Sequence, residues 1–305
     1  MSKARYNFED IGSNLTLAFA ADCEQDYERR VADTARIIAA RSEVAPLVLL
    51  AGPSGSGKTT TASKLRDEVQ RLGHPCRAVS MDDYYLSVNP DTHPRTERGD
   101  IDFESPYCLD IPLFHDHLTT LLEGGTAQIP SFDFAAGRRR DAAFMPLEVK
   151  RGDICIFEGI HALNPLFFKD LEDYTQRVYI SARADIYSKG QLFFKGTWVR
   201  LVRRMVRDAN FRGWDAAKTM TIWGDIRRGE KKYISPYWPS ANIALDTHMP
   251  YETLILKRFA LPLLAEIPHC EREAELREMA AALAEIPDLP LEYVPKHSLL
   301  REFIG

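Results

Sequence analysis

The segment GPSGSGKTT, residues 52–60, has residue types and a spacing that can bind a phosphate chain. It contains the full G-x-x-x-x-G-K-[ST] pattern, in which glycines let successive backbone N–H groups curl around phosphate oxygens without Cβ clashes. Lys58 can reach the β- and γ-phosphates, and Thr59 offers a hydroxyl to Mg²⁺. A glycine-rich turn with an exposed lysine would not require this spacing. The nucleotide-binding residues predicted from the pattern are Gly52, Ser54, Gly55, Ser56, Gly57, Lys58, Thr59 and Thr60.

Carboxylates follow two of the predicted strands. Asp82 comes after the apolar run 77–81, and Glu158 comes after DICIF, residues 153–157. Because the carboxyl ends of parallel strands line a ligand crevice, both side chains should face the phosphate-binding loop. Asp82 can accept the proton of a hydroxyl that attacks a γ-phosphoryl group, and Glu158 can hold a Mg²⁺-bound water. Chemistry alone leaves Asp83 as an equal candidate for the base, and a turn-forming Asp-Asp pair is the alternative.

The helix predicted at residues 196–208 has a basic face. Its arginines are three or four residues apart and therefore share one side of the helix. Planar guanidinium groups match phosphate oxygens and stabilise spread transition-state charge, so this face can close over ATP phosphates as a lid. A solvated basic face is the alternative for any single arginine. The residues concerned are Arg200, Arg203, Arg204, Arg207 and, just after the helix, Arg212.

Aromatic residues near the acidic positions can stack a planar base, with core packing as the alternative for each of them. They are Tyr84, Tyr85, Phe103, Phe132 and Phe134. His115 and His117 are two residues apart and do not share a helix face, so we interpret both as surface residues. His161 could approach a substrate or could be structural. The three arginines at 138–140 lie in a predicted turn and are interpreted as solvated.

The elements that must hold these residues alternate between strand and helix. The continuous apolar run PLVLLA, residues 46–51, predicts a parallel strand covered on both faces, and residues 58–72 predict the helix after the loop. The alternation predicts an α/β fold with a doubly wound parallel sheet. Residues 84–107 are predicted to form a long functional loop, and 128–134 could pair with 144–149 as a hairpin. Further strands are expected at 77–81, 153–157, 176–180 and 242–245, and further helices at 24–41, 110–123, 165–171, 196–208, 215–228, 253–264 and 271–284.

Composition limits the class of protein. With 305 residues, 45% of them hydrophobic, the chain can form one large α/β domain with additions or two small domains. The formal net charge of -5 argues against a non-specific nucleic-acid binder, which would carry a broad basic surface. No apolar run approaches the ~20 residues of a membrane span, and residues 1–10 lack the apolar core of a signal peptide, so a cytoplasmic protein is expected. The five separated cysteines indicate neither a disulfide framework nor a zinc site.

Six stretches resemble the uridine kinase branch of the phosphoribulokinase/uridine kinase family, in family order from about Val48 to Leu264. They are GPSGSGKTT, SMDDYY, DFESPYCLD, PSFDFAAGRR, IFEGIHAL and RLVRRMVRD. The later stretches KKYISPYWPSANIALDTHMPYE and VPKHSLLREFIG resemble bacterial uridine kinase-like proteins in which the kinase follows domains similar to the N-terminal part of threonyl-tRNA synthetase. Residues 1–45 are too few for those domains, so we do not expect them in this chain.

The resemblance implies a P-loop kinase sheet with a helical lid, ATP or GTP as donor with Mg²⁺, and phosphorylation of a ribose 5′-hydroxyl. It places the base at Asp82 in preference to Asp83, and the ribose-binding carboxylate at Glu104, where uridine kinases usually have Asp. The predicted catalytic residues are Lys58, Asp82, Arg204 and Arg207. Arg203 and Arg212 join the nucleotide-binding set, Thr59 and Glu158 form the metal set, and Asp82, Tyr85, Glu104, Phe132 and Phe134 form the substrate-binding set.

Three residues depart from the family pattern. Phe132 stands where a tyrosine is usual, Gly137 replaces a histidine, and Trp214 replaces an arginine of the lid. Most of these departures lie on the acceptor side. They leave phosphoryl transfer in place and predict a weakened or displaced preference among bases.

A kinase for a small nucleoside-like molecule is therefore the leading hypothesis. A kinase for another hydroxylated metabolite and, less favoured, a nucleotide-dependent regulatory module are the alternatives, and the chain contains no N-K-x-D guanine-recognition sequence. No nucleic-acid or membrane partner is expected, and self-association into a homo-oligomer stays open. We expect three segments: an N-terminal helical extension at 1–45, the P-loop kinase domain at 46–265, and a helical C-terminal tail packed on it at 266–305.

Overall fold

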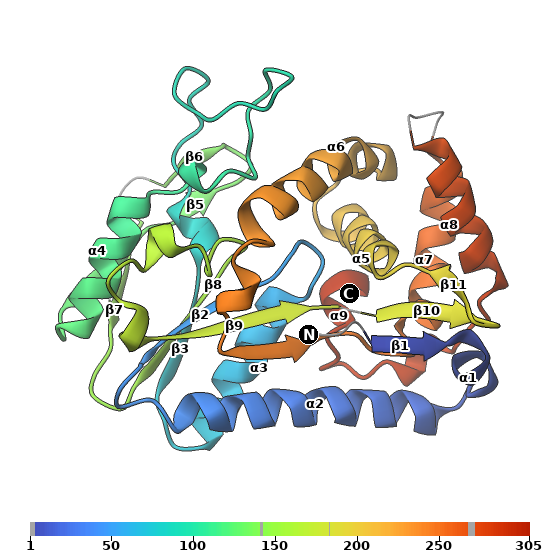
Figure 1. The fold of residues 1–305 in the computed structure, drawn as a ribbon, viewed down its shortest axis with the longest axis horizontal. Helices are drawn as coiled ribbons and strands as arrows, with labels where there is room; N and C mark the ends of the chain where they lie inside the picture. Colours follow the sequence, from blue (N-terminus) through green and yellow to red (C-terminus); the bar gives the residue numbers. More distant parts are fainter. Residues whose placement is uncertain (1–3, 141–142, 183, 268–271) are drawn as a thin grey trace.

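The computed structural model describes residues 4–140, 143–182, 184–267 and 272–305, and a five-stranded parallel sheet lies at its centre (Figure 1). The strand order is β12–β9–β2–β8–β3, so the strand that precedes the P-loop lies in the middle. All five predicted strands are present, and the predicted α/β doubly wound fold is confirmed. The strands are β2 Leu47–Ala51, β3 Cys76–Ser80, β8 Ile154–Glu158, β9 Thr175–Ser181 and β12 Ile243–Asp246.

Side chains alternate along the central strand between two hydrophobic cores. Val48 and Leu50 belong to the first core, whereas Leu47 and Leu49 belong to the second. A strand buried on both faces needs helices on both sides of the sheet. The first core is covered by α2 Leu17–Ala39, α3 Lys58–Arg71, α5 Gly196–Phe211, α6 Ala216–Gly229 and α7 Glu252–Ala265, and the second by α4 Ile111–Leu122.

The register of the sheet brings the predicted motifs to one edge. Glu158 at the end of β8 is paired with Leu50 of β2 on one side and with Ser80 of β3 on the other. The P-loop begins two residues after Leu50, and Asp82 lies two residues after Ser80. The phosphate-binding loop and both strand-end carboxylates therefore meet at the carboxyl edge of the sheet, where ligands bind in folds of this kind.

The structure contains a second, three-stranded sheet that the sequence did not predict. β1 Ala4–Asn7 pairs in parallel with β10 Ala184–Ser188, which pairs antiparallel with β11 Gln191–Phe194. The N-terminal segment is thus not helical throughout, since β1 precedes α1 Phe8–Ser13 and α2. Strands of four or five residues show too little alternation to be recognised by periodicity alone.

Residues 126–148 form two short antiparallel pairs, β4 Thr126–Ile129 with β7 Met145–Glu148 and β5 Phe132–Asp133 with β6 Arg138–Arg139. The predicted pairing of 128–134 with 144–149 is therefore right for the outer pair and wrong for Phe132–Asp133, which pair with the arginine run. Pro130 lies between β4 and β5, and it lacks the N–H that a continuous ladder would need.

Three further expectations are corrected. His117 is buried, and its Nδ1 lies 2.9 Å from the Tyr84 hydroxyl, because its side of α4 faces the second core. Pro165–Phe167 form only a 3₁₀ turn where a longer helix was expected. Arg138 and Arg139 form β6 where a turn was expected, and Arg139 is half-buried, whereas Arg138 and Arg140 are exposed as expected.

Segments before and after the P-loop domain pack into the first core. The Tyr27 hydroxyl of α2 lies 2.9 Å from Thr61 Oγ1 of α3, in a buried position. Met279 of α8 Glu273–Glu285 and Phe303 of α9 Arg301–Ile304 are buried in the same core as Leu50. The core is continuous across the three expected segments, and their division into domains stays a prediction.

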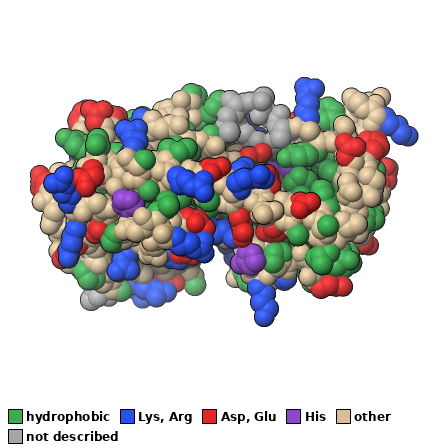
Figure 2. Space-filling view, turned by 90° about the horizontal axis from the view of Figure 1, so that it is seen from below, with side chains coloured by type: hydrophobic (Ala, Val, Ile, Leu, Met, Phe, Trp, Pro, Cys, Tyr) green, Lys and Arg blue, Asp and Glu red, His purple; other side chains and the backbone are tan. Residues whose placement is uncertain are grey.

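Acidic and basic side chains are interspersed over the face shown in Figure 2, which is the lower side of Figure 1. Among the described residues, no helix combines the length and the apolar character that crossing a membrane requires. Four cysteines are buried with free thiols, and Cys270 lies outside the described residues. The four are Cys23, Cys76, Cys108 and Cys155.

A substitution of Gln176 tests the hydrogen bonds that hold the end of α2 to the sheet. The buried Nε2 of Gln176 donates to the carbonyl oxygens of Ile38 and Ala45, both at 2.9 Å. Gln176→Leu leaves both carbonyl groups without this donor, so the free energy of unfolding should fall by about 1–3 kcal/mol. Urea denaturation measures the change, and Gln128→Leu at an exposed position of β4 should alter stability by less than about 0.5 kcal/mol. Equal losses in the two variants would contradict a fastening role for the buried amide.

Candidate active site

The P-loop wraps around the N-terminal end of α3. Gly55 and Gly57 have φ angles of 73° and 80°, in the left-handed region that side chains disfavour. Gly57 is the N-cap of α3 and has no side chain to cap it, so N–H groups of the first turn are available to an anion. Lys58 Nζ lies 3.4 Å from the carbonyl oxygen of Pro53, at the base of the loop. The backbone therefore has the form of a phosphate cradle.

Neighbouring strands and loops hold this backbone in place. The carbonyl oxygen of Ile180 lies so close to Gly52 that a Cβ there would be 2.5 Å from it. Thr247 Oγ1, after β12, donates to the carbonyl oxygen of Ser56 at 2.7 Å. The glycine at position 52 is thus required by close packing, in addition to any contact with phosphate.

Glu158 reaches the P-loop from the end of β8. Thr59 Oγ1 donates to Glu158 Oε1 at 2.9 Å. Burial, together with the charge of Asp82, raises the pKa of Glu158 to about 7, and Lys58 opposes the rise. A hydroxyl and a buried carboxylate side by side are hard oxygen ligands of the kind that Mg²⁺ prefers. The two residues predicted for the metal are therefore in contact with each other.

The adjacent carboxylates Asp82 and Asp83 lie in different surroundings. Burial raises the pKa of Asp82, and Lys58 and two arginines counteract the rise. Asp83 Oδ1 instead accepts the N–H of Phe132 at 3.2 Å, which ties it to the β5–β6 hairpin. The two carboxylates therefore differ in their contacts, and the choice of Asp82 as the base stays a prediction.

Three arginines of α5 contact the P-loop. Arg200 donates to the carbonyl oxygen of Ser54 at 3.0 Å, and Arg204 donates to the Ser54 hydroxyl at 2.5 Å. Arg203 donates to the carbonyl oxygen of Gly55 at 3.4 Å. The predicted lid helix thus lies against the P-loop and supports its backbone.

Arg200 and Arg203 are each buried in an ion pair with a glutamate. Arg203 is paired with Glu252 at 2.5 and 3.0 Å, and it also donates to the carbonyl oxygen of Thr247 at 2.8 Å. Arg200 is paired with Glu230 at 2.5 and 3.0 Å. Buried charges are tolerated when they are fully paired in this way. The structure places Arg203 behind the P-loop, and its contact with a nucleotide stays a prediction.

Asp208 gathers the remaining arginines, and the sequence reasoning did not single it out. It is fully buried and lies 3.1 Å from Arg204, 2.7 Å from Arg207 and 3.6 Å from Arg212. Thr219 Oγ1 of α6 donates to the same carboxylate at 3.4 Å. Several guanidinium groups on one carboxylate leave positive charge in excess beside the P-loop. Its spacing of four residues from Arg204 on one helix is the signal that could have identified it.

Tyr85, Phe132 and Phe134 form an aromatic cluster after Asp82. The ring centroids lie 5.7 Å apart for Tyr85 and Phe132, 5.9 Å for Tyr85 and Phe134, and 4.9 Å for Phe132 and Phe134. Burial and the charges of Asp82 and Glu104 raise the pKa of Tyr85. Phe134 is 64% exposed and so keeps ring surface for a ligand. The structure brings together the residues that were predicted for the acceptor.

Glu104 lies in the long loop and packs against the C-terminal end of α6. Gly229 lies against Glu104 and leaves no room for a Cβ. The neighbouring Asp102 accepts the hydroxyl of Tyr233 at 3.0 Å, from a π-helical turn at Glu230–Ile234. Such turns are frequent at functional sites. Burial raises the pKa of Glu104 to about 7, and the charge of Arg204 opposes the rise.

Arg139 fastens the aromatic hairpin to the sheet, although the sequence pattern indicates only a solvated basic run. Its guanidinium donates to the carbonyl oxygens of Tyr85 at 3.1 Å and Tyr84 at 3.0 Å. It also pairs at 2.9 Å with Asp110, the N-cap of α4. These partners are 29 to 55 residues away along the chain, so no local pattern could have identified the role.

His161 is buried among aromatic rings. Its ring is stacked on Phe167 with centroids 6.3 Å apart, and it meets Tyr233 edge-on at the same distance. Burial lowers the pKa of His161 to about 3, so the ring is neutral. The stacking on Phe167 agrees with a structural role, and a contact between His161 and a substrate stays a prediction.

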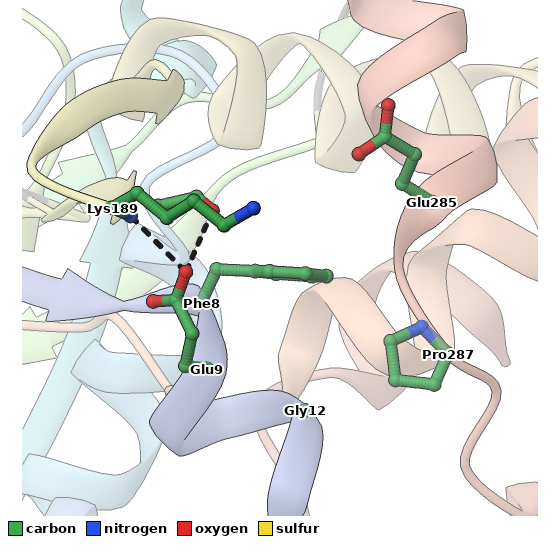
Figure 3. Close-up of a pocket in the computed structure, with 7 residues that line it drawn as sticks. Phe8, Glu9, Gly12, Lys189, Glu285 and Pro287 are labelled. Atoms are coloured by element: carbon green, nitrogen blue, oxygen red, sulfur yellow. Dashed lines mark hydrogen bonds between the residues drawn. The ribbon is translucent and has the colours of Figure 1, made fainter.

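A groove away from the P-loop lies between α1, the β10–β11 turn and the end of α8 (Figure 3). Glu9 Oε1 accepts the Ser188 hydroxyl at 2.7 Å and the N–H of Lys189 at 3.1 Å. Of the two carboxylates that line this groove, Glu9 therefore holds the turn, and we assign the groove a structural part. Its lining residues are Phe8, Glu9, Gly12, Ser188, Lys189, Glu285 and Pro287.

The P-loop on the middle strand, with Thr59 bonded to a strand-end carboxylate, defines a P-loop kinase fold. The sequence matches the model of the phosphoribulokinase/uridine kinase family over residues 47–253, and the chain belongs to that family. A uridine kinase from Staphylococcus aureus (strain JH9) is 29% identical to it over 167 residues, which are 55% of this chain and 70% of the relative.

Two solved structures share the fold. One, described as a candidate fructose transport system kinase from Silicibacter sp. TM1040, has a TM-score of 0.54 and 20% identity, and the match covers 70% of this chain and 98% of that one. The other, described as a candidate uridine kinase from Bacillus stearothermophilus, has a TM-score of 0.50 and 17% identity, with 72% and 98% covered. Identities this low show the fold alone.

Glu104→Gln tests the ionisation of this buried carboxylate. The pKa of Glu104 is raised from 4.5 to about 7, so between these values the folded state keeps a proton that the unfolded state has lost. The protonated Glu104 side chain therefore contributes to the free energy of unfolding at low pH, and this contribution is lost as the pH rises toward 7. Relative to wild type, the stability of Glu104→Gln should rise by ~1–3 kcal/mol from pH 4.5 to 7.5. Urea denaturation across this range measures the difference.

Glu97→Gln is the matched control, because Glu97 is an exposed carboxylate of the same loop. Its stability relative to wild type should change little over the same pH range. A flat difference for Glu104→Gln as well would show that Glu104 ionises as an ordinary surface carboxylate.

Proposed function

We propose that this protein is an ATP- and Mg²⁺-dependent kinase that transfers the γ-phosphoryl group to the 5′-hydroxyl of a nucleoside. Family membership supports phosphoryl transfer to a small molecule. The observation that carries the nucleoside part is the aromatic cluster of Tyr85, Phe132 and Phe134. The charges of Asp82 and Glu104 both act on Tyr85, and the ring of Phe134 is exposed. Rings can stack a flat base, and carboxylates can bind ribose hydroxyls.

Asp82 is the proposed general base. A base works best when its pKa is close to the working pH, and burial moves the pKa of Asp82 upward. Lys58 lies close enough to oppose this shift, so the base and the phosphate-binding cation share one site. Lys58, Arg204 and Arg207 then supply positive charge for the transferred phosphoryl group. The Asp208 carboxylate keeps the two arginines in place without neutralising both.

Thr59 and Glu158 are the proposed residues of the Mg²⁺ site. Their side chains are hydrogen-bonded to each other at the edge of the P-loop, and both present oxygen ligands. When bound, Mg²⁺ neutralises charge on the β- and γ-phosphates. The donor is ATP in this proposal, with GTP as the alternative.

We further propose that selection among bases is weak. Strong discrimination needs buried polar groups that the wrong ligand leaves unpaired. Phe132 and Phe134 lack hydroxyl groups, and Gly137 lies at the hairpin turn with a φ of 65° and no side chain. Trp214 is engaged by Lys218, whose Nζ lies 4.1 Å from the centre of its ring. These positions supply surface for stacking and little polar readout.

Asp82→Asn should lower kcat by about 10²- to 10⁴-fold with a modest change in nucleotide affinity, because it removes the proton acceptor and leaves the P-loop unchanged. Steady-state kinetics and calorimetric titration of ADP measure the two effects. Asp83→Asn is the matched control and should reduce kcat much less, since Asp83 is bonded to the hairpin backbone. The opposite ranking would identify Asp83 as the base.

An ADP-release assay with a panel of acceptors tests the function. Uridine, cytidine, adenosine, guanosine, inosine and thymidine should each stimulate turnover, with kcat/KM values that differ by less than about 10³-fold. A preference above this value for uridine and cytidine over every purine would contradict weak selection. Stimulation only by a sugar or sugar phosphate would favour a different metabolite kinase, and ATP hydrolysis independent of any acceptor would favour a regulatory module.

A further inference from the structure

The C-terminal tail contacts the P-loop although it lies outside the residues that match the family. The match ends at residue 253, and the tail ends with α9, which lies near the N-terminal end of α3 (Figure 1). Glu302 Oε2 accepts the backbone N–H of Thr60 at 3.2 Å. A carboxylate from the last turn of the chain is therefore bonded to the phosphate-binding loop.

The N–H of Thr60 is one of the groups that a P-loop uses for phosphate. Thr60 belongs to the first turn of α3, where backbone N–H groups have no acceptor within the helix. The next residue is already satisfied, because Thr61 N donates to the carbonyl oxygen of Gly57 at 3.0 Å. The helix dipole favours an anion at this end, and phosphate groups bind there for the same reason. Glu302 thus supplies a carboxylate where a phosphate oxygen would bind.

Packing determines where the tail presents Glu302. Leu299 and Phe303 are buried in the first core. Leu299 lies against Gly57, where a Cβ would be 2.6 Å from its Cδ1. Asn210 Nδ2 of α5 donates to the carbonyl oxygen of Phe303 at 3.0 Å, and the Arg203 guanidinium lies 5.1 Å from the centre of the Phe303 ring. With the backbone anchored on both sides of Glu302, movement of its side chain alone can release the N–H of Thr60.

The charge of Glu302 acts on the same groups that would attract a nucleotide. Burial lowers the pKa of Lys58, and Glu158, Asp82 and Glu302 oppose the shift. Glu302 also acts in this sense on Arg212, whose pKa is lowered mainly by burial. A phosphate that approaches Lys58 therefore meets the like charge of Glu302.

We propose that Glu302 is an affinity-determining residue of the nucleotide site, whose carboxylate competes with a nucleotide phosphate for the N–H of Thr60. This inference rests on the proposed nucleotide-binding function. In the free protein, Glu302 caps α3 and stabilises the P-loop. Nucleotide binding displaces the carboxylate, so the tail lowers the affinity for nucleotide while it raises the stability of the free protein.

Glu302→Gln tests the competition, because it keeps the shape of the side chain and removes its charge. The dissociation constants of Mg²⁺-ADP and of inorganic tripolyphosphate should fall by about five- to tenfold, measured by calorimetric titration. In thermal unfolding, the melting temperature of the free variant should be lower than that of wild type. Glu292→Gln is the matched control, since Glu292 is an exposed carboxylate of the same C-terminal segment, and it should change neither quantity.

Opposite changes in affinity and stability are the signature of competition. If Glu302→Gln binds ADP equally well or more weakly, or if Glu292→Gln tightens binding to the same extent, the inference is overturned. The wild-type titration separates this result from a failure of the proposed function. Binding of ADP by wild type without a gain in Glu302→Gln refutes only the role of Glu302, whereas absence of binding by wild type refutes the nucleotide site itself.

Discussion

The N–H groups of the first turn of α3, which have no acceptor within the helix, are the constraint on which the rest of the site depends. Gly57 as N-cap provides no side chain for them, and the left-handed backbone of Gly55 and Gly57 turns the loop around them. Groups of this kind need an acceptor, and the helix dipole makes an anion the preferred one. In the free protein a carboxylate of the C-terminal tail contacts one of them. The P-loop backbone, Lys58 and the C-terminal tail thus all lie around the same anion-binding end of α3.

Helix α5 connects this cradle to the remainder of the molecule. Its arginines touch the P-loop backbone on one side and buried carboxylates on the other. Because an unpaired buried charge is strongly destabilising, each pair restrains the geometry of both partners. Asp208 extends the same principle to the arginines nearest the phosphate site. The helix is therefore a scaffold for the loop as well as a source of positive charge.

The part of the site that carries Glu104 and the aromatic cluster is built differently, from loops that side-chain hydrogen bonds hold to the sheet. Arg139 connects the hairpin to the segment after β3 and to the start of α4. Asp83 accepts a backbone N–H of the same hairpin, and Tyr233 binds the loop that carries Glu104. These contacts bring aromatic surface and carboxylates from separate segments to the carboxyl edge of the sheet. Such an arrangement allows these loops to vary while the P-loop stays the same.

The sequence by itself determined the α/β class, the five strands of the central sheet and the P-loop, because each depends on a local pattern of apolar runs or glycine spacing. It also indicated that Asp82 and Glu158 follow strands whose carboxyl ends face the P-loop, and the structure showed that these two strands are neighbours. Local chemistry could not separate Asp82 from Asp83, and only the structure shows that Asp83 accepts the N–H of Phe132. The assignment of the base to Asp82 stays a proposal. The second sheet, the burial of Arg203, the roles of Asp208 and Arg139, and the contact of Glu302 with Thr60 were decided only by tertiary structure. Their partners lie far apart in the chain or require buried surroundings, and periodicity and residue type carry no information about either.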